Sequence, residues 1–209
     1  WINHVNQKVM TDAVARVANA FYVLFISPPH LASIGFIWPP LPSFLELPLV
    51  AIWPIYQPIA SSALAGVILS AIFSAGTGLL IYRNCNYFRL KGWLAWLLIA
   101  LFCLNPFVFL YGSNGMSESM FIFMLVWSTT QMVQWIDDGR PVHVLWIAVA
   151  LALGFLTRYE AIPFAIAFLM TGLTAFGSDG AKAMPSNFML IHVSSVCICL
   201  GTSSVGGTK

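Results

Sequence analysis

The chain has 209 residues, of which 59% are hydrophobic and 8% are charged, and its mean hydropathy is +0.86. A soluble domain carries about 25% charged residues, so this composition excludes an ordinary water-soluble fold. The formal net charge is only +2, and no basic face accompanies exposed aromatic side chains, so nucleic-acid binding is excluded as well. The four cysteines lack the spacing of metal ligands, and no metal site is predicted from them.

The first region, residues 1–58, is predicted to lie outside the cytoplasm and against the membrane. Apolar residues recur at helical spacing over residues 11–25, with Asp12, Arg16 and Asn19 on the opposite side. This pattern is typical of an amphipathic helix that lies at an interface. Residues 28–58 hold eight of the twelve prolines, and each interior proline removes a helix hydrogen bond. We therefore expect a Pro-rich loop with a short helix near residues 43–53 that does not cross the bilayer.

The second region, residues 59–202, is predicted to form about six transmembrane helices, because runs of about 20 apolar residues can cross a bilayer. The candidate spans are residues 60–82, 93–111, 117–135, 143–157, 161–176 and 187–201. Residues 203–209 are expected to be a frayed or truncated end, and the chain to be a fragment of a larger membrane protein. The expected fold class is thus all-α, a polytopic transmembrane helical bundle.

Loop charges predict how this bundle is oriented. Five of the nine Lys and Arg residues lie in residues 83–91, residues 137–140 and at Lys182, which alternation of the spans brings to one side. The positive-inside rule makes that side cytoplasmic. The opposite side then receives residues 1–58, the loop 112–116 and the turn 158–160.

Three polar clusters meet on the non-cytoplasmic side in this topology. They are Asp12 with Arg16 and Asn19, the segment from Asn114 to Glu118, and Arg158 with Glu160. Ionisable groups at membrane depth are costly and usually functional. A carboxylate there can act as a general base, and the fork of an arginine suits a phosphate. His30, beside two prolines, is a further candidate for contact with a donor or an acceptor.

Each cluster also has a purely structural explanation. The first can cap the helix that begins near Asp12, since such residues satisfy free N–H groups. The second can open a membrane helix, where an acid favours the helix dipole. The third can mark the water interface, and His30 can be an incidental loop residue. These alternatives stay open.

The order of these pieces resembles the GT-C superfamily of membrane glycosyltransferases, which includes the protein O-mannosyltransferases. The segments that carry the resemblance are Thr11–Ala13, the Pro-rich Trp38–Pro42, Asn105–Pro106 at a helix end, Ser117–Glu118 and Arg158–Glu160. Together they span roughly residues 10–175. The chain departs from the family where Asp12 is followed by Ala13 and Val14, because the family usually has an acidic pair in its first loop.

The resemblance implies an integral-membrane glycosyltransferase that moves a sugar from a polyprenyl-phosphate-linked donor to an acceptor hydroxyl. Transfer would occur on the outer face of the plasma membrane, or in the endoplasmic reticulum of a eukaryote. The partners would be membrane lipid, the lipid-linked donor and an acceptor that the sequence does not identify. Members of the superfamily differ in metal dependence, so the need for a divalent metal stays open.

The resemblance also implies roles for the candidate residues. Asp12 would be the catalytic base, Glu118 a second acid, and Arg158 the main phosphate contact, with Arg16 as a weaker one. The remaining substrate-binding candidates are Asn19, His30, Asn114 and Glu160. Two alternatives remain: a transporter or flippase of lipid-linked substrates, which usually shows internal repeats, and a non-catalytic membrane scaffold.

Overall fold

The computed structural model describes residues 11–34 and 39–177. The predicted helix 187–201, the end 203–209 and Trp38 of the Pro-rich segment lie outside the described residues. Within them, every regular element is a helix, and the all-α prediction is confirmed for this part of the chain. The elements are α2 (Thr11–Phe25), the 3-10 helix η1 (Leu31–Ile34), α3 (Leu41–Val50), α4 (Pro58–Ser61), α5 (Leu64–Tyr87), α6 (Gly92–Leu104), α7 (Pro106–Ser113), α8 (Glu118–Asp138), α9 (Pro141–Phe155) and α10 (Ala161–Gly177).

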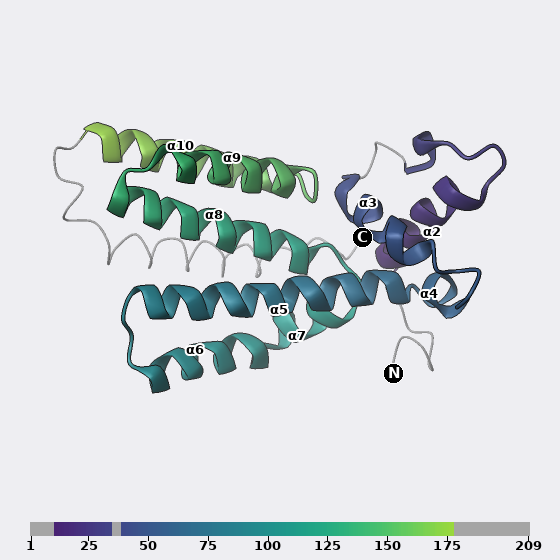
Figure 1. The fold of residues 1–209 in the computed structure, drawn as a ribbon, viewed down its shortest axis with the longest axis horizontal. Coiled ribbons are helices and arrows are strands. Elements are labelled where there is room, and N and C mark those ends of the chain that lie inside the picture. The colour runs from purple at the N-terminus through teal and green to yellow at the C-terminus, as the bar shows by residue number, and fades with distance from the viewer. Residues whose placement is uncertain (1–10, 35–38, 178–209) are drawn as a thin grey trace, which may run out of the picture.

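Helices α5 to α10 form a bundle, and α2, η1, α3 and α4 gather at one end of it as an N-terminal cap (Figure 1). Helix α8 packs against both α5 and α9. The cap is held to the start of α5 by a buried apolar cluster that includes Val17, Ala20, Val50, Ile59 and Ala65. Where such side chains would otherwise be exposed to water, their burial is the main favourable contribution to the free energy of packing.

Helix α5 is long and apolar enough to cross a membrane by itself, with 24 residues. The expected span 93–111 is not one straight helix, because it is divided into α6 and α7, which meet at an angle of 62° and together are long and apolar enough to cross a membrane. Pro106 lacks the N–H that a continuous helix needs, and it keeps Asn105 extended. The Asn105 side chain then accepts a hydrogen bond from the Phe107 N–H at 2.9 Å, which caps the new helix α7.

The bundle carries large apolar side chains on its outside. The following are at least 60% exposed: Leu79 on α5, Trp93 and Leu101 on α6, Leu145 on α9 and Leu169 on α10. Apolar surface of this extent is unusual on a protein surrounded by water. It requires lipid or further helices as its neighbour.

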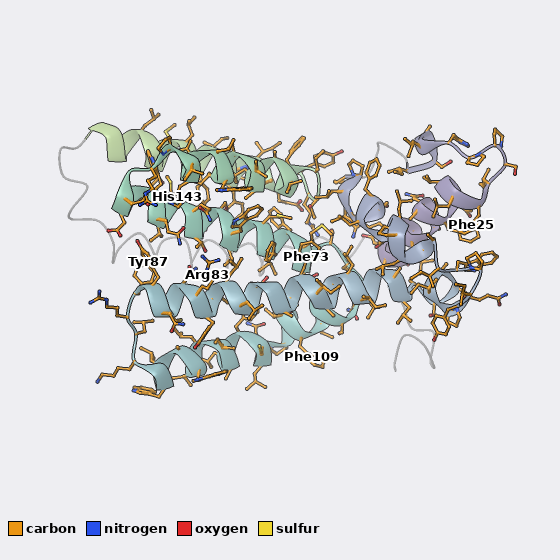
Figure 2. The ribbon with its side chains drawn as sticks, viewed as in Figure 1. Phe25, Phe73, Arg83, Tyr87, Phe109 and His143 are labelled. Carbon is orange, nitrogen blue, oxygen red and sulfur yellow. The ribbon has the colours of Figure 1, made fainter. Side chains whose placement is uncertain are left out.

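Two of the three basic segments that the charge analysis assigned to one side, 83–91 and 137–140, lie at one end of the bundle, and Lys182 lies outside the described residues. Tyr87 at the end of α5 donates a hydrogen bond to Asp137 near the end of α8. His143 Nε2 on α9 lies 3.1 Å from Asp138 Oδ2. Figure 2 shows Tyr87 and His143 at the end away from Phe25 of the cap. This end is therefore separate from the one that carries the cap.

The N-terminal cap is connected to the bundle by one backbone hydrogen bond and one close approach at two glycines. The Leu41 N–H at the start of α3 donates to the carbonyl oxygen of Leu156 after α9, at 3.1 Å. A Cβ on Gly66 of α5 would lie 3.2 Å from the carbonyl oxygen of Gly115, and a Cβ on Gly115 would lie 3.3 Å from the Cβ of Ala13 on α2. Because neither glycine has a Cβ, α2, α5 and the loop before α8 can approach this closely.

We expect Gly115→Ala to lower the melting temperature of the purified protein more than Gly139→Ala does. Both glycines have positive φ, +72° and +67°, and a non-glycine residue in that conformation costs about 1 kcal/mol. At Gly139 nothing lies within 4 Å of an added Cβ, whereas at Gly115 backbone atoms of α5 lie 3.1 Å away. Equal losses of melting temperature would show that the close approach adds no cost to the backbone strain.

Candidate functional site

Charged side chains from four parts of the chain converge where the cap meets the bundle, and we call this set the charged cluster. Its members are Asp12 and Arg16 of α2, Glu46 of α3, Glu118 at the start of α8, and Arg158 and Glu160 of the turn between α9 and α10. The cluster contains two guanidinium groups and four carboxyl groups. It lies at the opposite end of the bundle from Tyr87 and His143.

Arg158 is held by two acids. Its Nη1 donates to Glu118 Oε1, its Nη2 donates to Glu160 Oε1 at 2.7 Å, and its Nε donates to Glu160 Oε2 at 3.1 Å. Burial by itself would lower the pKa of Arg158, but the hydrogen bonds and charges of Glu160 and Glu118 raise it above its usual value. The hydrogen bonds from Arg158 in turn lower the pKa of Glu160. Arg158 is therefore a fixed positive charge.

Arg16 is turned into the protein, contrary to the predicted orientation of the amphipathic helix. Arg16 is 6% exposed, while Val14, which was expected on the apolar side, is 45% exposed. Burial lowers the pKa of Arg16, and the charges of Glu118, Asp12 and Glu46 act against this shift. The surrounding acids explain the orientation, because a buried guanidinium needs opposite charges nearby. Its Nε and Nη1 atoms have no hydrogen-bond partner among the described residues.

Asp12 lies one helical turn before Arg16, in the first turn of α2. It is half-buried, and residues four apart on a helix are neighbours. The pair therefore places a carboxylate at the rim of the charged cluster, next to a guanidinium with free N–H donors. A substrate hydroxyl could reach such a carboxylate from outside.

Glu46 is a member of the cluster that sequence reasoning missed. It is 1% exposed, and burial raises its pKa to about 8, with the charge of Arg16 acting in the other direction. Its Oε2 atom has no partner within the described part of the chain. The sequence feature that could have revealed Glu46 is that it is the single acid inside the apolar stretch 44–50, in a chain with only seven carboxylate side chains.

The other predicted site residues make local contacts. Asn19 Nδ2 donates to the carbonyl oxygen of Ile34 at 3.0 Å and so attaches η1 to α2. His30 is exposed, and its ring nitrogens lie 2.8 Å from the Pro28 carbonyl oxygen and 2.9 Å from Ser33 Oγ. Asn114 ends α7 beside Gly115. The structure thus brings Asp12, Arg16, Glu118, Arg158 and Glu160 together and leaves Asn19 and His30 outside the charged cluster.

No group of three or more His, Cys, Asp and Glu side chains is arranged to hold a metal ion in residues 11–34 and 39–177. The charged cluster is instead organised around its two arginines. Arginine can donate several hydrogen bonds to an oxyanion in a fixed geometry, and here four carboxyl groups surround the two guanidinium groups.

We expect Glu118→Ala to destabilise the protein by about 3 kcal/mol, the cost of leaving a buried charge without one of its partners. The matched change Glu160→Ala removes the other acid from the same arginine. The Glu160 side chain is 53% exposed, against 11% for Glu118, so its loss is expected to cost no more than about 1 kcal/mol. Thermal unfolding in detergent measures both changes, and an equal or larger effect of Glu160→Ala would contradict the assignment of Glu118 as the buried partner.

The fold and the charged cluster first define a class: a helical protein with an apolar exterior, a membrane-length helix and a buried ionic site at one end. Comparison with protein families then identifies the family. The chain belongs to the dolichyl-phosphate-mannose-protein mannosyltransferase family, whose model matches residues 39–204. It is therefore a member of a family of membrane glycosyltransferases, as the sequence resemblance predicted. A search of curated proteins and a search of solved structures each found no match.

The matched segment contains part of the charged cluster. Glu46, Glu118, Arg158 and Glu160 lie inside residues 39–204, whereas α2, with Asp12 and Arg16, precedes them. The fold places the unmatched helix α2 near the acids of the matched segment.

Proposed function

We propose that this protein is a polytopic integral-membrane glycosyltransferase that moves a sugar from a polyprenyl-phosphate-linked donor to an acceptor hydroxyl. The observation that carries the proposal is the convergence of Asp12, Arg16, Glu118 and Arg158 at one end of an apolar helical bundle. The family description names dolichyl-phosphate-mannose as donor and a protein as acceptor. Mannose and a protein hydroxyl are accordingly the sugar and the acceptor that we propose here.

In the proposed reaction, Asp12 is the general base. It takes the proton of the acceptor hydroxyl as the acceptor oxygen forms a bond to the anomeric carbon of the sugar. The bond between this carbon and the phosphate oxygen breaks, and the polyprenyl phosphate leaves with the electron pair. Asp12 suits this role because it is the half-buried acid at the rim of the cluster.

The two arginines receive the phosphate. Arg158 is a fixed positive charge held by Glu118 and Glu160, and Arg16 adds buried Nε and Nη1 atoms that have no hydrogen-bond partner among the described residues. As negative charge grows on the leaving phosphate, donors that are already in position stabilise it without rearranging. Glu118 then acts mainly by orienting Arg158.

An apolar groove supports the choice of a lipid-linked donor. It has a volume of about 490 Å³ and lies between α9 and α10, with Phe155, Ala161, Ile162 and Leu169 among its lining residues. Phe155 and Ala161 flank the turn that carries Arg158. A donor whose phosphate contacts Arg158 can therefore lay its isoprenoid chain along the groove, where apolar surface is buried.

The proposal places the charged cluster on the outer face of the plasma membrane, or on the lumenal face of the endoplasmic reticulum in a eukaryote. The segments 83–91 and 137–140 carry Arg83, Arg89, Lys91 and Arg140, and Figure 2 shows Arg83 and Tyr87 toward the end of the bundle away from the cap. Basic loops favour the cytoplasmic side. The charged cluster would then face away from the cytoplasm.

We expect Asp12→Asn in the full-length protein to lower the rate of mannose transfer by about 10²-fold or more, the usual contribution of a general base. The amide has the size of the carboxylate but cannot accept the proton. Transfer of radiolabelled mannose from a polyprenyl-phosphate donor in membranes measures the effect.

The matched control is Asp138→Asn, which removes a carboxylate at the opposite end of the bundle. It is expected to retain transfer. Full activity of Asp12→Asn would contradict the role of Asp12, and absence of transfer by the wild-type protein with any lipid-linked donor would favour a scaffold or a transporter.

A further inference from the structure

We propose that residues 83–91, which join α5 to α6 and which we call the basic segment, bind the headgroups of anionic phospholipids in the adjoining leaflet. Arg89 and Lys91 are the principal contacts in this proposal. It rests on the membrane location that is part of the proposed function, and it is independent of sugar transfer. The occupant is a phospholipid whose headgroup carries a net negative charge, such as phosphatidylglycerol.

The first observation is the distribution of charge along the chain. Residues 47–82 and residues 92–117 contain no Asp, Glu, Lys or Arg. The basic segment between them carries three cations and no acid, namely Arg83, Arg89 and Lys91. All three are exposed, and within residues 11–34 and 39–177 none of them takes part in an ion pair. The basic segment is therefore a concentration of positive charge without an acid in contact with it.

The acids at this end of the bundle have other partners. Asp137 accepts the hydrogen bond from Tyr87. Asp138 Oδ2 lies 3.1 Å from His143 Nε2 and 3.4 Å from Arg140 Nε. These contacts hold the ends of α5, α8 and α9 together, and they leave the cations of the basic segment to a ligand from outside the protein.

The second observation is the level at which the basic segment lies. From Leu64 to Tyr82, α5 rises about 28 Å at 1.5 Å per residue, close to the hydrocarbon thickness of about 30 Å. Arg83 is the first charged residue after this stretch, and Figure 2 shows it toward the end of the bundle away from the cap. When α5 spans the bilayer, the basic segment therefore lies at the level of the lipid headgroups.

Exposed aromatic side chains lie beside the basic segment. Tyr82 on α5 is 39% exposed, and Trp93 and Trp96 on α6 are each 66% exposed. The rings of Tyr82 and Trp96 lie 5.9 Å apart and so connect the two helices. Tyr and Trp are enriched where acyl chains meet headgroups, because their rings are apolar at one end and polar at the other. Such side chains next to unpaired cations favour a lipid over a soluble acidic partner.

The third observation is the backbone of Arg89, which has a φ of +52°. Its N–H donates to the carbonyl oxygen of Asn86, and the Leu90 N–H donates to that of Cys85, both at 3.0 Å. This pair of hydrogen bonds is the Schellman motif, whose left-handed position is usually glycine. A side chain strains the backbone there, and outliers of this kind cluster at functional sites. The fork of an exposed arginine suits the phosphate oxygens of a headgroup.

The proposal predicts a preference for anionic lipid that depends on the basic segment. Native mass spectrometry of the full-length protein in detergent, titrated with phosphatidylglycerol or with phosphatidylcholine of the same acyl chains, measures the dissociation constant of each lipid. We expect Arg89→Gly to weaken phosphatidylglycerol binding by roughly fivefold, the usual contribution of one cation near anionic headgroups. The double variant with Lys91→Gln is expected to weaken it by roughly 25-fold if the two contributions add. Binding of phosphatidylcholine is expected to stay unchanged in both variants.

Two further variants are matched controls. Arg89→Lys keeps the positive charge and is expected to retain most of the affinity for phosphatidylglycerol. Arg140→Gln removes a cation at the same end of the bundle that already faces Asp138, and it is expected to weaken binding by less than about twofold. A loss as large in Arg140→Gln as in Arg89→Gly would overturn the proposal, because lipid binding would then follow the overall charge of this end.

The variant Arg89→Gly also separates loss of binding from loss of fold. Glycine adopts a positive φ without strain, so the melting temperature of this variant in phosphatidylcholine nanodiscs is expected to be at least that of the wild type. In phosphatidylglycerol nanodiscs the wild type is expected to gain more, since a ligand of the folded state stabilises it.

Equal gains of melting temperature in the wild type and in Arg89→Gly would overturn the proposal, as would full affinity of the double variant for phosphatidylglycerol. Displacement of the lipid by excess inorganic phosphate would show a site for a free anion and would overturn the choice of a lipid. Neither experiment measures sugar transfer, so failure of the lipid preference leaves the proposed function standing, and failure of transfer leaves the lipid preference standing.

Discussion

The burial of the Arg16 guanidinium is the constraint on which the cap end of this protein depends. A buried cation is tolerated only with acids close by, and here they come from α2, α3 and α8. Helix α2 must therefore turn Arg16 inward, and α3 must place Glu46 near the Arg16 guanidinium. Helix α8 must begin close enough to this group for Glu118 to act on it. The close approach of Gly66 and Gly115 allows this, because any side chain at these positions would hold the helices apart.

The sequence predicted the members of the charged cluster that stand out as rare charges near helix ends. Asp12, Glu118 and Arg158 each lie where a polar loop meets an apolar run, so alternation of the spans was enough to bring them to one side. Glu46 was missed because it lies inside an apolar stretch, and its surroundings include the charge of Arg16 and the backbone of Gly66, which are distant in sequence. The rotation of α2 was missed for the same reason, since a hydrophobic pattern alone assigns charged side chains to the water.

Most of the helices could be predicted from the apolar runs of the sequence, but not every helix boundary. Apolar runs indicated α5, α8, α9 and α10, but the break between α6 and α7 depends on Asn105 acting as a cap for the helix that Pro106 begins. His30 and Asn19 show the limit of reasoning from residue type. Each can serve a substrate, yet each is satisfied by a backbone carbonyl a short distance away, a contact that local loop geometry decides.

The hydrogen bond between Leu41 and Leu156 has a consequence for the order of folding. It closes a segment that contains α3 to α9, and the ion pair of Glu118 with Arg158 also joins residues far apart in the chain. Contacts of such long sequence separation form late, because the intervening helices must first be in position. The charged cluster thus forms only when the helices from α2 to α9 are in position. A nascent chain that extends only as far as α8 would carry Asp12, Glu46, Glu118 and Arg16 without Arg158, the arginine that pairs with Glu118.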